Sequence, residues 1–215
     1  MLILTKAFIS IIQIFLITTA GYIFFRIRTF KQLYRPLLFY TVNFALPVLI
    51  IYRLITKFNF ELFLQTLSLP LYGAFLIFWG YFVGKQLVPH MNLRAEKKNI
   101  FISLMMFSNI GYLPLPLFES VFQGDDIALA QIYVFFIALV YTSLIWSVGV
   151  NMLRHREGVF QRTKFKVTAP FLALLSGVAL SFLDLKTYIT GPVESVIRSV
   201  GTSGVYLVMF IMGGG

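Results

Sequence analysis

Long apolar runs alternate with short polar segments along the whole chain. A helix that crosses a bilayer needs about 20 consecutive apolar residues, and seven runs come close to this length or reach it. Their approximate bounds are 7–25, 36–56, 65–88, 99–122, 127–152, 168–184 and 196–213. The last run is the least regular. Residues Thr187–Gly204 carry Glu194 and Arg198 and are interpreted as a partly interfacial helix, and the purely apolar part, Val205–Met212, is too short to cross alone. The pattern predicts an all-α membrane protein, a polytopic helical bundle.

The fourth run contains residues that break a helix near the middle of the membrane. Pro114 and Pro116 lack a backbone N–H, and Gly111 permits unusual backbone angles or a close approach to a neighbour. Ser108 and Asn109 add uncharged polar groups at the same depth. Freed backbone groups are tolerated there only where protein buries them or water reaches them. Two interpretations stay open: a kinked packing helix, and a discontinuous helix at a transport site.

The second run carries a related pattern, in which Asn43 lies one helical turn before Pro47. The Asn43 amide could satisfy a carbonyl group that Pro47 leaves without a donor, which is a purely structural role. It could instead line a polar cavity together with Asn109, since an asparagine precedes a proline in both runs. Both interpretations stay open.

The composition supports a membrane protein and excludes several other classes. Of the 215 residues, 59% are hydrophobic and 12% are charged, whereas soluble domains are about 45–50% apolar and about 25% charged. The net charge of +10 lies in short loops between apolar runs, so it indicates loop charge beside a lipid bilayer rather than nucleic-acid binding. There is no cysteine, which excludes disulfides and Cys-ligated metals.

The distribution of lysine and arginine predicts an orientation in the cell membrane. Most of these cations lie in the first, third and fifth loops, at 26–35, 85–98 and 154–166, whereas the fourth loop has none. Loops rich in lysine and arginine stay in the cytoplasm. We therefore expect a multi-pass protein of the plasma or inner membrane with its N-terminus outside.

The sequence shows no enzyme signature. His90 and His155 both lie in loops, and no HExxH, GxSxG or phosphate-binding GxxxxGK[ST] motif occurs. We expect no catalysis, no cofactor and no metal. Ionisable residues within the runs are rare: Glu119 and Arg53 lie at the outer ends of the fourth and second runs. We interpret both as interfacial anchors, whose charged ends reach toward water.

A weak internal similarity suggests an inverted repeat. Gly21 precedes Pro47 by 26 residues, and the same step from Gly177 reaches Ser203. A repeat with an odd number of helices enters the membrane with opposite topology in its second copy, as in many secondary transporters. The predicted division is a five-helix repeat at 1–152, a basic cytoplasmic loop at 153–167, and the start of a second, inverted and truncated repeat at 168–215.

Taken in order, the motifs resemble the auxin efflux carrier family of membrane permeases, which includes plant auxin exporters and bacterial permeases of small organic acids. Similar segments occur over essentially the whole chain: Ala20–Tyr22, Asn43–Pro47, Ser108–Leu117, Ala169–Gly177, and Val200, Gly201 and Gly213. The stretch Ser108–Leu117 resembles the family's crossover motif, NxGxxGxPL, with Pro114 in place of the second glycine. The short basic loop at 153–167 resembles that of the bacterial members.

The resemblance implies a secondary transporter for a small organic anion such as a carboxylate. A half-helix N-terminus at the break would favour an anion, because its free N–H groups carry partial positive charge. The expected substrate-binding residues are Asn43, Pro47, Ser108, Asn109, Gly111, Pro114 and Pro116. The family usually has about ten helices, so a truncated, non-transporting remnant or an accessory membrane subunit is the alternative function. A homodimer is an open alternative for the assembly.

Overall fold

The computed structural model describes residues 2–108, 113–154, 167–183 and 185–214, and all regular structure in these ranges is helical. The helices in chain order are α1 (Leu2–Arg26), α2 (Arg28–Lys31), α3 (Tyr34–Tyr40), α4 (Leu46–Lys57), α5 (Phe60–Thr66), α6 (Leu69–Leu87), α7 (Ala95–Met106), α8 (Pro114–Val121), α9 (Asp125–Leu144), α10 (Val150–Arg154), α11 (Ala169–Ser181) and α12 (Gly191–Met212). Wider π-helical turns follow α3 at Thr41–Ala45 and α9 at Ile145–Gly149, and short 3₁₀ turns lie at Val88–His90 and Leu185–Tyr188.

Within the described ranges, five continuous helical segments are long and apolar enough to cross a membrane. They are Thr5–Arg26, Arg28–Lys57, Phe60–His90, Asp125–Gly149 and Gly191–Met212. These segments confirm the first, second, third, fifth and seventh predicted runs. The sixth run forms α11, an apolar helix of 13 residues that is shorter than a membrane span. The fourth run is divided between α7 and α8.

The last run is more regular than its sequence indicated. A single helix, α12, continues from Gly191 to Met212 and includes both Glu194 and Arg198. The carboxylate of Glu194 accepts a hydrogen bond from the hydroxyl of Tyr52 at 2.8 Å. That charge therefore has a polar partner on α4, and the helix that contains it is long and apolar enough to cross a membrane. The expectation that the residues before Val205 lie partly at the interface stays a prediction.

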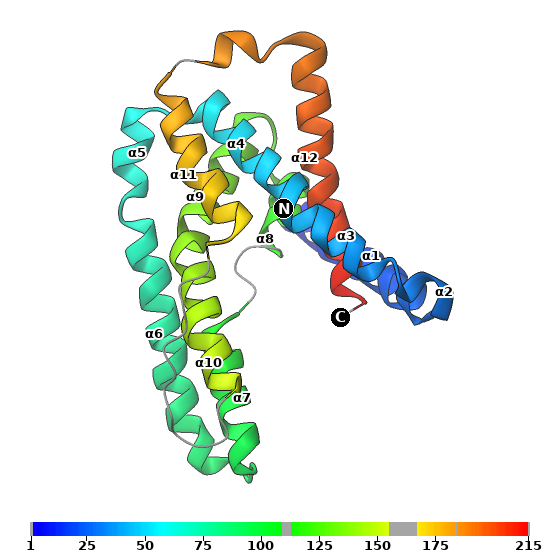
Figure 1. Ribbon diagram of the computed structural model, residues 1–215, viewed down its shortest axis with the longest axis vertical. Coiled ribbons are helices and arrows are strands. Elements are labelled where there is room, and N and C mark those ends of the chain that lie inside the picture. The colour runs from blue at the N-terminus through cyan, green and yellow to red at the C-terminus, as the bar shows by residue number, and fades with distance from the viewer. Residues whose placement is uncertain (1, 109–112, 155–166, 184, 215) are drawn as a thin grey trace.

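The second run is one continuous helical segment with a locally widened turn. The N–H of Leu46 bonds to the carbonyl of Thr41, five residues back rather than four. Directly after this turn stands Pro47, which has no N–H and whose ring would collide with the carbonyl four residues earlier. Widening the preceding turn moves that carbonyl aside. The segment therefore continues past Pro47, with α3 and α4 roughly in line (Figure 1).

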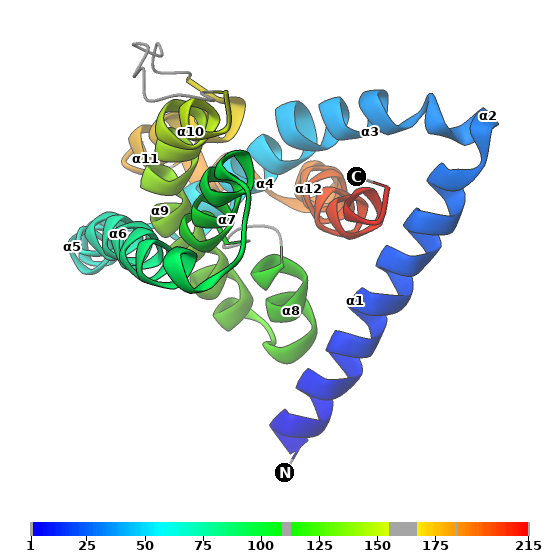
Figure 2. The ribbon, with the colours of Figure 1, turned by 90° about the horizontal axis from the view of Figure 1, so that it is seen from below.

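Helix α4 is the centre of the packing. It lies against α11, α12 and α9, and α6 packs against α7 and α9 on another side of the molecule. Figure 2 shows α12 in the angle between α1 and α3, and α6 far from α1. The core that these contacts enclose includes the fully buried Leu49 and Leu54 of α4, Ile132 of α9 and Val205 of α12.

Small residues allow α12 to lie very close to α4. A Cβ atom added at Gly204 would lie 2.8 Å from the Cβ of Ala45, and one at Gly201 would lie 3.0 Å from the Cα of Leu49. Neither distance leaves room for a larger side chain. Close helix approach at small residues is a common source of stability in membranes, because van der Waals packing rather than the hydrophobic effect holds such helices together.

The outward faces of α1 and α6 are apolar and exposed. They present Phe8 and Phe15 on α1 and Leu71 and Phe78 on α6. Apolar surface of this extent is unusual on a soluble monomer. It suits contact with the acyl chains of a bilayer, in agreement with the lengths of these two helices.

Candidate functional site

The helix break predicted in the fourth run lies between α7 and α8. Helix α7 ends at Met106, and Phe107 leaves helical geometry with φ −113° and ψ 68°. Helix α8 begins at Pro114, and its cap residue Leu113 provides no side-chain hydrogen bond. The intervening Asn109 and Gly111, two of the predicted binding residues, lie outside the described residues.

The sequence indicated that Pro114 and Pro116 break a helix, whereas in the structure they begin one. Both Pro114 and Pro116 lie in the first turn of α8, where the backbone N–H groups have no intrahelical partner in any case. Proline is favourable at such a position, because its fixed φ already suits a helix. The prolines therefore begin a new helix at no cost in hydrogen bonds. Pro116 is buried and Pro114 is half-buried.

Tyr141 of α9 fixes the end of α7. Its hydroxyl oxygen lies 2.7 Å from the carbonyl oxygen of Ser108 and 3.1 Å from that of Met106, and it donates to these two acceptors. The hydroxyl of Ser108 lies 3.3 Å from the same oxygen and is then the donor to it. The Tyr141 ring also meets Phe107 edge to face, with centroids 5.7 Å apart. Tyr141 thus satisfies carbonyl groups that lose helical partners at the break.

A cavity of about 640 Å³ lies beside the break. Its walls come from α4, α7, α9, α10 and α11, from Leu115 of α8 and from the π-helical turn after α9. One face of α7 contributes Ile100, Ser103 and Leu104 at helical spacing, and Phe107 follows directly after the helix. Ser108 also lines this cavity. Among its described lining residues there is no Asp, Glu, Lys, Arg or His.

Asn43 lies in a second cavity of about 620 Å³, together with Arg35, Val42 and Thr168. Its amide nitrogen donates to the carbonyl of Phe39 at 3.1 Å, one turn earlier in the same segment. Asn43 therefore has a local backbone partner and faces a cavity. The carbonyl of Phe39, eight residues before Pro47, is not one that Pro47 leaves without a donor, so the expected structural role differs from this contact, and the role in a polar cavity stays a prediction. Asn109, the proposed partner across that cavity, lies outside the described residues.

The structure separates the predicted site residues that it describes. Ser108 lines the first cavity, Asn43 lines the second, and the described linings of both cavities lack Pro47, Pro114 and Pro116. The two cavities are nevertheless adjacent, since Thr142 and Pro170 belong to the walls of both.

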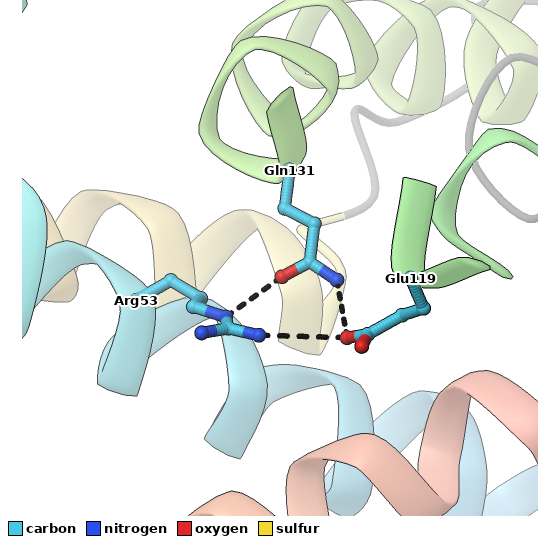
Figure 3. Close-up of polar contacts among 3 residues, drawn as sticks. All are labelled: Arg53, Glu119 and Gln131. Atoms are coloured by element: carbon cyan, nitrogen blue, oxygen red, sulfur yellow. Dashed lines mark hydrogen bonds and ion pairs between the residues drawn. The ribbon is translucent and has the colours of Figure 1, made fainter. Parts of the chain in front are cut away.

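A buried polar cluster joins three helices at the other end of α4. In Figure 3, Arg53 of α4 points toward Gln131 of α9 and Glu119 of α8. The Arg53 Nε donates to the Gln131 Oε1 at 2.7 Å, and the Gln131 Nε2 donates to the Glu119 Oε1 at 2.8 Å. An Arg53 Nη2 lies 3.4 Å from the same carboxylate oxygen. Arg53 is 7% exposed and Gln131 is fully buried.

This cluster corrects the sequence interpretation of Arg53 and Glu119 as interfacial anchors. Both side chains turn inward, because each finds a partner of opposite charge and a glutamine that can accept from one and donate to the other. A buried charge without such partners would be very costly. The sequence did show two opposite charges at the outer ends of two apolar runs. Because they are 66 residues apart along the chain, no local sequence pattern predicts that they are in contact.

Two further contacts tie the same end of α4 to its neighbours. The Tyr52 hydroxyl donates to Glu194 of α12. The Lys57 Nζ lies 2.6 Å from a carboxylate oxygen of Asp125 at the start of α9, on a more exposed surface. Within the described part of the chain, no group of three or more His, Cys, Asp or Glu residues could hold a metal ion.

Comparison with known proteins gives one match. The sequence model of a protein family described as "Membrane transport protein" matches residues 6–215, which includes every helix that lines the two cavities. Neither a curated protein nor a solved structure matches the chain.

Proposed function

The chain belongs to this membrane transport protein family, the auxin efflux carrier family, and on that premise we propose that it is a secondary transporter for a small organic anion such as a carboxylate. It is a multi-pass membrane protein with five candidate spans in its described part. The family consists of membrane transporters and is not an enzyme family. Its members require a lipid bilayer and a transported substrate.

The observation that carries the proposal is the helix break beside a large cavity. In the first turn of α8, Pro114 and Pro116 have no N–H, so the group without a helical acceptor at the positive end of the helix dipole is the N–H of Leu115, a residue of the cavity wall. Such groups bind anions without a buried lysine or arginine, and the described lining of the first cavity has neither. Asn109 belongs to the segment between the two helices and would donate a further hydrogen bond at no cost in buried charge.

The second cavity adds a cationic group near the same place. Arg35 lines it together with Asn43, and the walls of the two cavities meet at Thr142 and Pro170. An arginine in a cavity favours entry of an anion over a cation. This arrangement supports an anionic substrate and gives Asn43 the role of a polar wall residue.

The packing of two glycines supports an inverted-repeat architecture. A Cβ atom at Gly21 of α1 would overlap the backbone of Phe210 on α12, and one at Gly177 of α11 would lie 2.7 Å from the side chain of Leu54 on α4. Gly177 follows Gly21 by 156 residues, and Phe210 follows Leu54 by the same number. Reciprocal contacts between corresponding residues are what a two-fold relation between repeats produces.

The same packing indicates how the substrate site would open. Glycines and alanines hold α1, α4, α11 and α12 together, while α6, α7 and α9 form a second group. The walls of the first cavity come from both groups. Rocking of one group against the other would therefore expose the cavity first on one side of the membrane and then on the other.

The proposal is tested with the purified chain in detergent and a panel of acids matched to their neutral amides. Acetate, butyrate, octanoate and succinate are each compared with the corresponding amide for the shift in unfolding temperature. A bound ligand stabilises the folded state in proportion to RT ln(1 + [L]/Kd). We expect at least one acid to raise the unfolding temperature while its amide does not. Equal shifts for acids and amides, or no shift with any acid, would contradict an anion site.

A further inference from the structure

The polar cluster of Arg53, Glu119 and Gln131 lies directly against one end of the first cavity. Each of its residues is one helical turn away from a residue of the cavity wall. The pairs are Arg53 with Ile50 on α4, Glu119 with Leu115 on α8, and Gln131 with Phe135 on α9. Residues three or four positions apart share one face of a helix. The cluster is therefore a polar layer across this end of the cavity, next to its apolar wall.

Two contacts beyond the polar layer close the same end. Lys57, in the last turn of α4, has its Nζ 2.6 Å from a carboxylate oxygen of Asp125 at the start of α9. Phe58, directly after α4, stacks on Phe136 of α9 with ring centroids 5.4 Å apart, and both residues are 5% exposed. Both contacts join the end of α4 to α9, so the two helices are held together on the side of Asp125.

The opposite end of the first cavity is open. The wall there includes Ile100, near the start of α7, and Leu153 of α10, which are 45% and 56% exposed. Figure 1 shows α7 and α10 together at the lower end of the molecule, away from α5, the helix that follows α4. The adjoining loops are the third and the fifth, which are rich in lysine and arginine. The cavity therefore opens on the side of the basic loops and is closed on the side of Asp125.

The polar layer lies where the two groups of helices meet. Arg53 belongs to the group of α1, α4, α11 and α12, and Gln131 belongs to the group of α6, α7 and α9. The 2.7 Å hydrogen bond between them, drawn in Figure 3, therefore crosses the boundary along which the proposed rocking motion would occur. If the two groups separate at this end, this bond must break and water must reach the side chains.

A layer of charged side chains suits an element that opens and closes. The attraction between buried opposite charges is largely offset by the loss of their hydration. When the layer separates, Arg53 and Glu119 lose each other but regain water, so the closed and the open arrangement differ little in free energy. A two-state element requires such a balance.

We infer that the polar layer of Arg53, Glu119 and Gln131 is the gate of the transporter on the side of Asp125. The structure then has this gate closed and the first cavity open toward the basic loops. The inference rests on the proposed function and adds to it the residues that hold the closed state. It also assigns the Lys57–Asp125 ion pair to the outer surface of the same gate.

The first experiment measures from which side of the membrane the cavity can be reached. Thr142→Cys places a thiol at a half-buried position in the wall of both cavities, in a chain without cysteine. An impermeant, anionic methanethiosulfonate is added to intact cells and, separately, to inverted membrane vesicles. The variant Gln123→Cys identifies the preparation that exposes the side of Asp125. We expect Thr142→Cys to react faster from the opposite side, where the cavity is open.

The second experiment opens the gate. Gln131→Leu removes the hydrogen bonds to Arg53 and Glu119, and the closed layer then leaves charged groups without partners that water provides in the open state. Loss of a buried hydrogen bond shifts such an equilibrium about 5- to 150-fold. We expect labelling of Thr142→Cys from the side of Asp125 to accelerate by this factor. Glu119→Gln, which keeps the size of the side chain, should have an effect in the same direction.

A matched control separates the gate from a general effect of removing a glutamine. Gln65→Leu replaces an exposed glutamine on α5, whose amide bonds to Glu61 of the same helix. It should leave the labelling rate of Thr142→Cys unchanged from both sides. The unfolding temperature of each variant is measured in parallel, because a purely structural layer would change this temperature without changing the side from which the cavity is reached.

Three outcomes decide between the proposals. Equal labelling of Thr142→Cys from both sides, with the polar layer unchanged, would mean that no closed gate exists and the inference is wrong. The inference is also wrong if neither Gln131→Leu nor Glu119→Gln accelerates labelling from the side of Asp125. If no acid binds but labelling is one-sided and Gln131→Leu accelerates it, the organic-anion proposal is wrong and the gate stands.

Discussion

Among single residues, Arg53 makes the contacts with the largest expected effect on stability. It lies almost fully buried between a glutamine and a carboxylate that come from two other helices. The 2.7 Å contact to Gln131 is shorter than the 3.4 Å contact to Glu119, so the glutamine makes the better hydrogen bond and also positions the acid. The three side chains therefore act as a unit, and removal of any one leaves the others incompletely paired.

We predict that Arg53→Met lowers the free energy of unfolding by about 3–5 kcal/mol, since it leaves the Glu119 carboxylate without its cation. Titration with a denaturing detergent measures this change. The double variant Arg53→Met, Glu119→Leu should recover much of the loss, because no uncompensated charge is then buried. Lys57→Met is the control, since its partner Asp125 is largely exposed. If Arg53→Met and Lys57→Met had the same effect, the cluster would contribute nothing specific.

A second prediction concerns Asn109, which the sequence indicates as a donor to the anion. One hydrogen bond to a charged group contributes about 1.5–3 kcal/mol, so Asn109→Ala should weaken binding of the best carboxylate roughly 10- to 150-fold. The unfolding temperature of the free protein should change little. Asn92→Ala, at an exposed loop position, is the matched control. Unchanged affinity in Asn109→Ala would remove this residue from the site.

The sequence could indicate which residues break a helix but not which residues pair across the fold. Pro114 and Pro116 act through local backbone chemistry, so the break between α7 and α8 was predictable. The partners of Arg53 lie 66 and 78 residues away along the chain. Whether a charge at the end of an apolar run turns outward or inward depends on those distant partners, and no local pattern contains that information.

At the scale of helices, close approach at glycine determines which pairs pack. The Cβ of an alanine at Gly21 would overlap backbone atoms of Phe210, whereas one at Gly177 would meet mainly the flexible side chain of Leu54. A side chain can change its rotamer, but backbone contact can be relieved only by moving a whole helix.

We therefore predict that Gly21→Ala destabilises the protein by about 1–3 kcal/mol through overpacking, and that Gly177→Ala costs less. Thermal unfolding in detergent compares the two. Ala20→Val, at an exposed position next to Gly21 on α1, should have little effect. A larger loss for Gly177→Ala than for Gly21→Ala would mean that α1 and α12 do not pack as described.

Apolar runs predicted helices well where a single helix matches a single run. The runs were less informative about helix ends and local geometry where a helix is short or contains a π-helical turn. The sixth run was expected to span 168–184, but α11 ends at Ser181 after 13 residues. The π-helical turn before Pro47 was not expected, because a widened turn leaves the composition and the length of the apolar run unchanged. For the last run, Glu194 and Arg198 made the purely apolar part look too short to cross, whereas α12 continues from Gly191 to Met212 and includes both charges.

For the whole molecule, the orientation in the membrane stays a prediction from loop charge. Loops rich in lysine and arginine at 26–35, 85–98 and 154–166 predict a cytoplasmic location. The chain has no cysteine, so single cysteines can be introduced without background. We expect Gln123→Cys to react with an impermeant thiol reagent in intact cells and Glu157→Cys to react only after lysis. The opposite result would invert the orientation.

The contact between α1 and α12 also has a consequence for biosynthesis. The ribosome completes α1 at Arg26, but its partner residues Phe210 and Gly213 are added 184 and 187 residues later (210 − 26 and 213 − 26). At roughly 5–20 residues per second, α1 waits on the order of 10–40 s before α12 exists. During this interval the surface of α1 around Gly21 contacts only lipid or helices made before α12. A translocon or an insertion chaperone that shields α1 while it waits should therefore increase the yield of folded protein, and slower translation should decrease it.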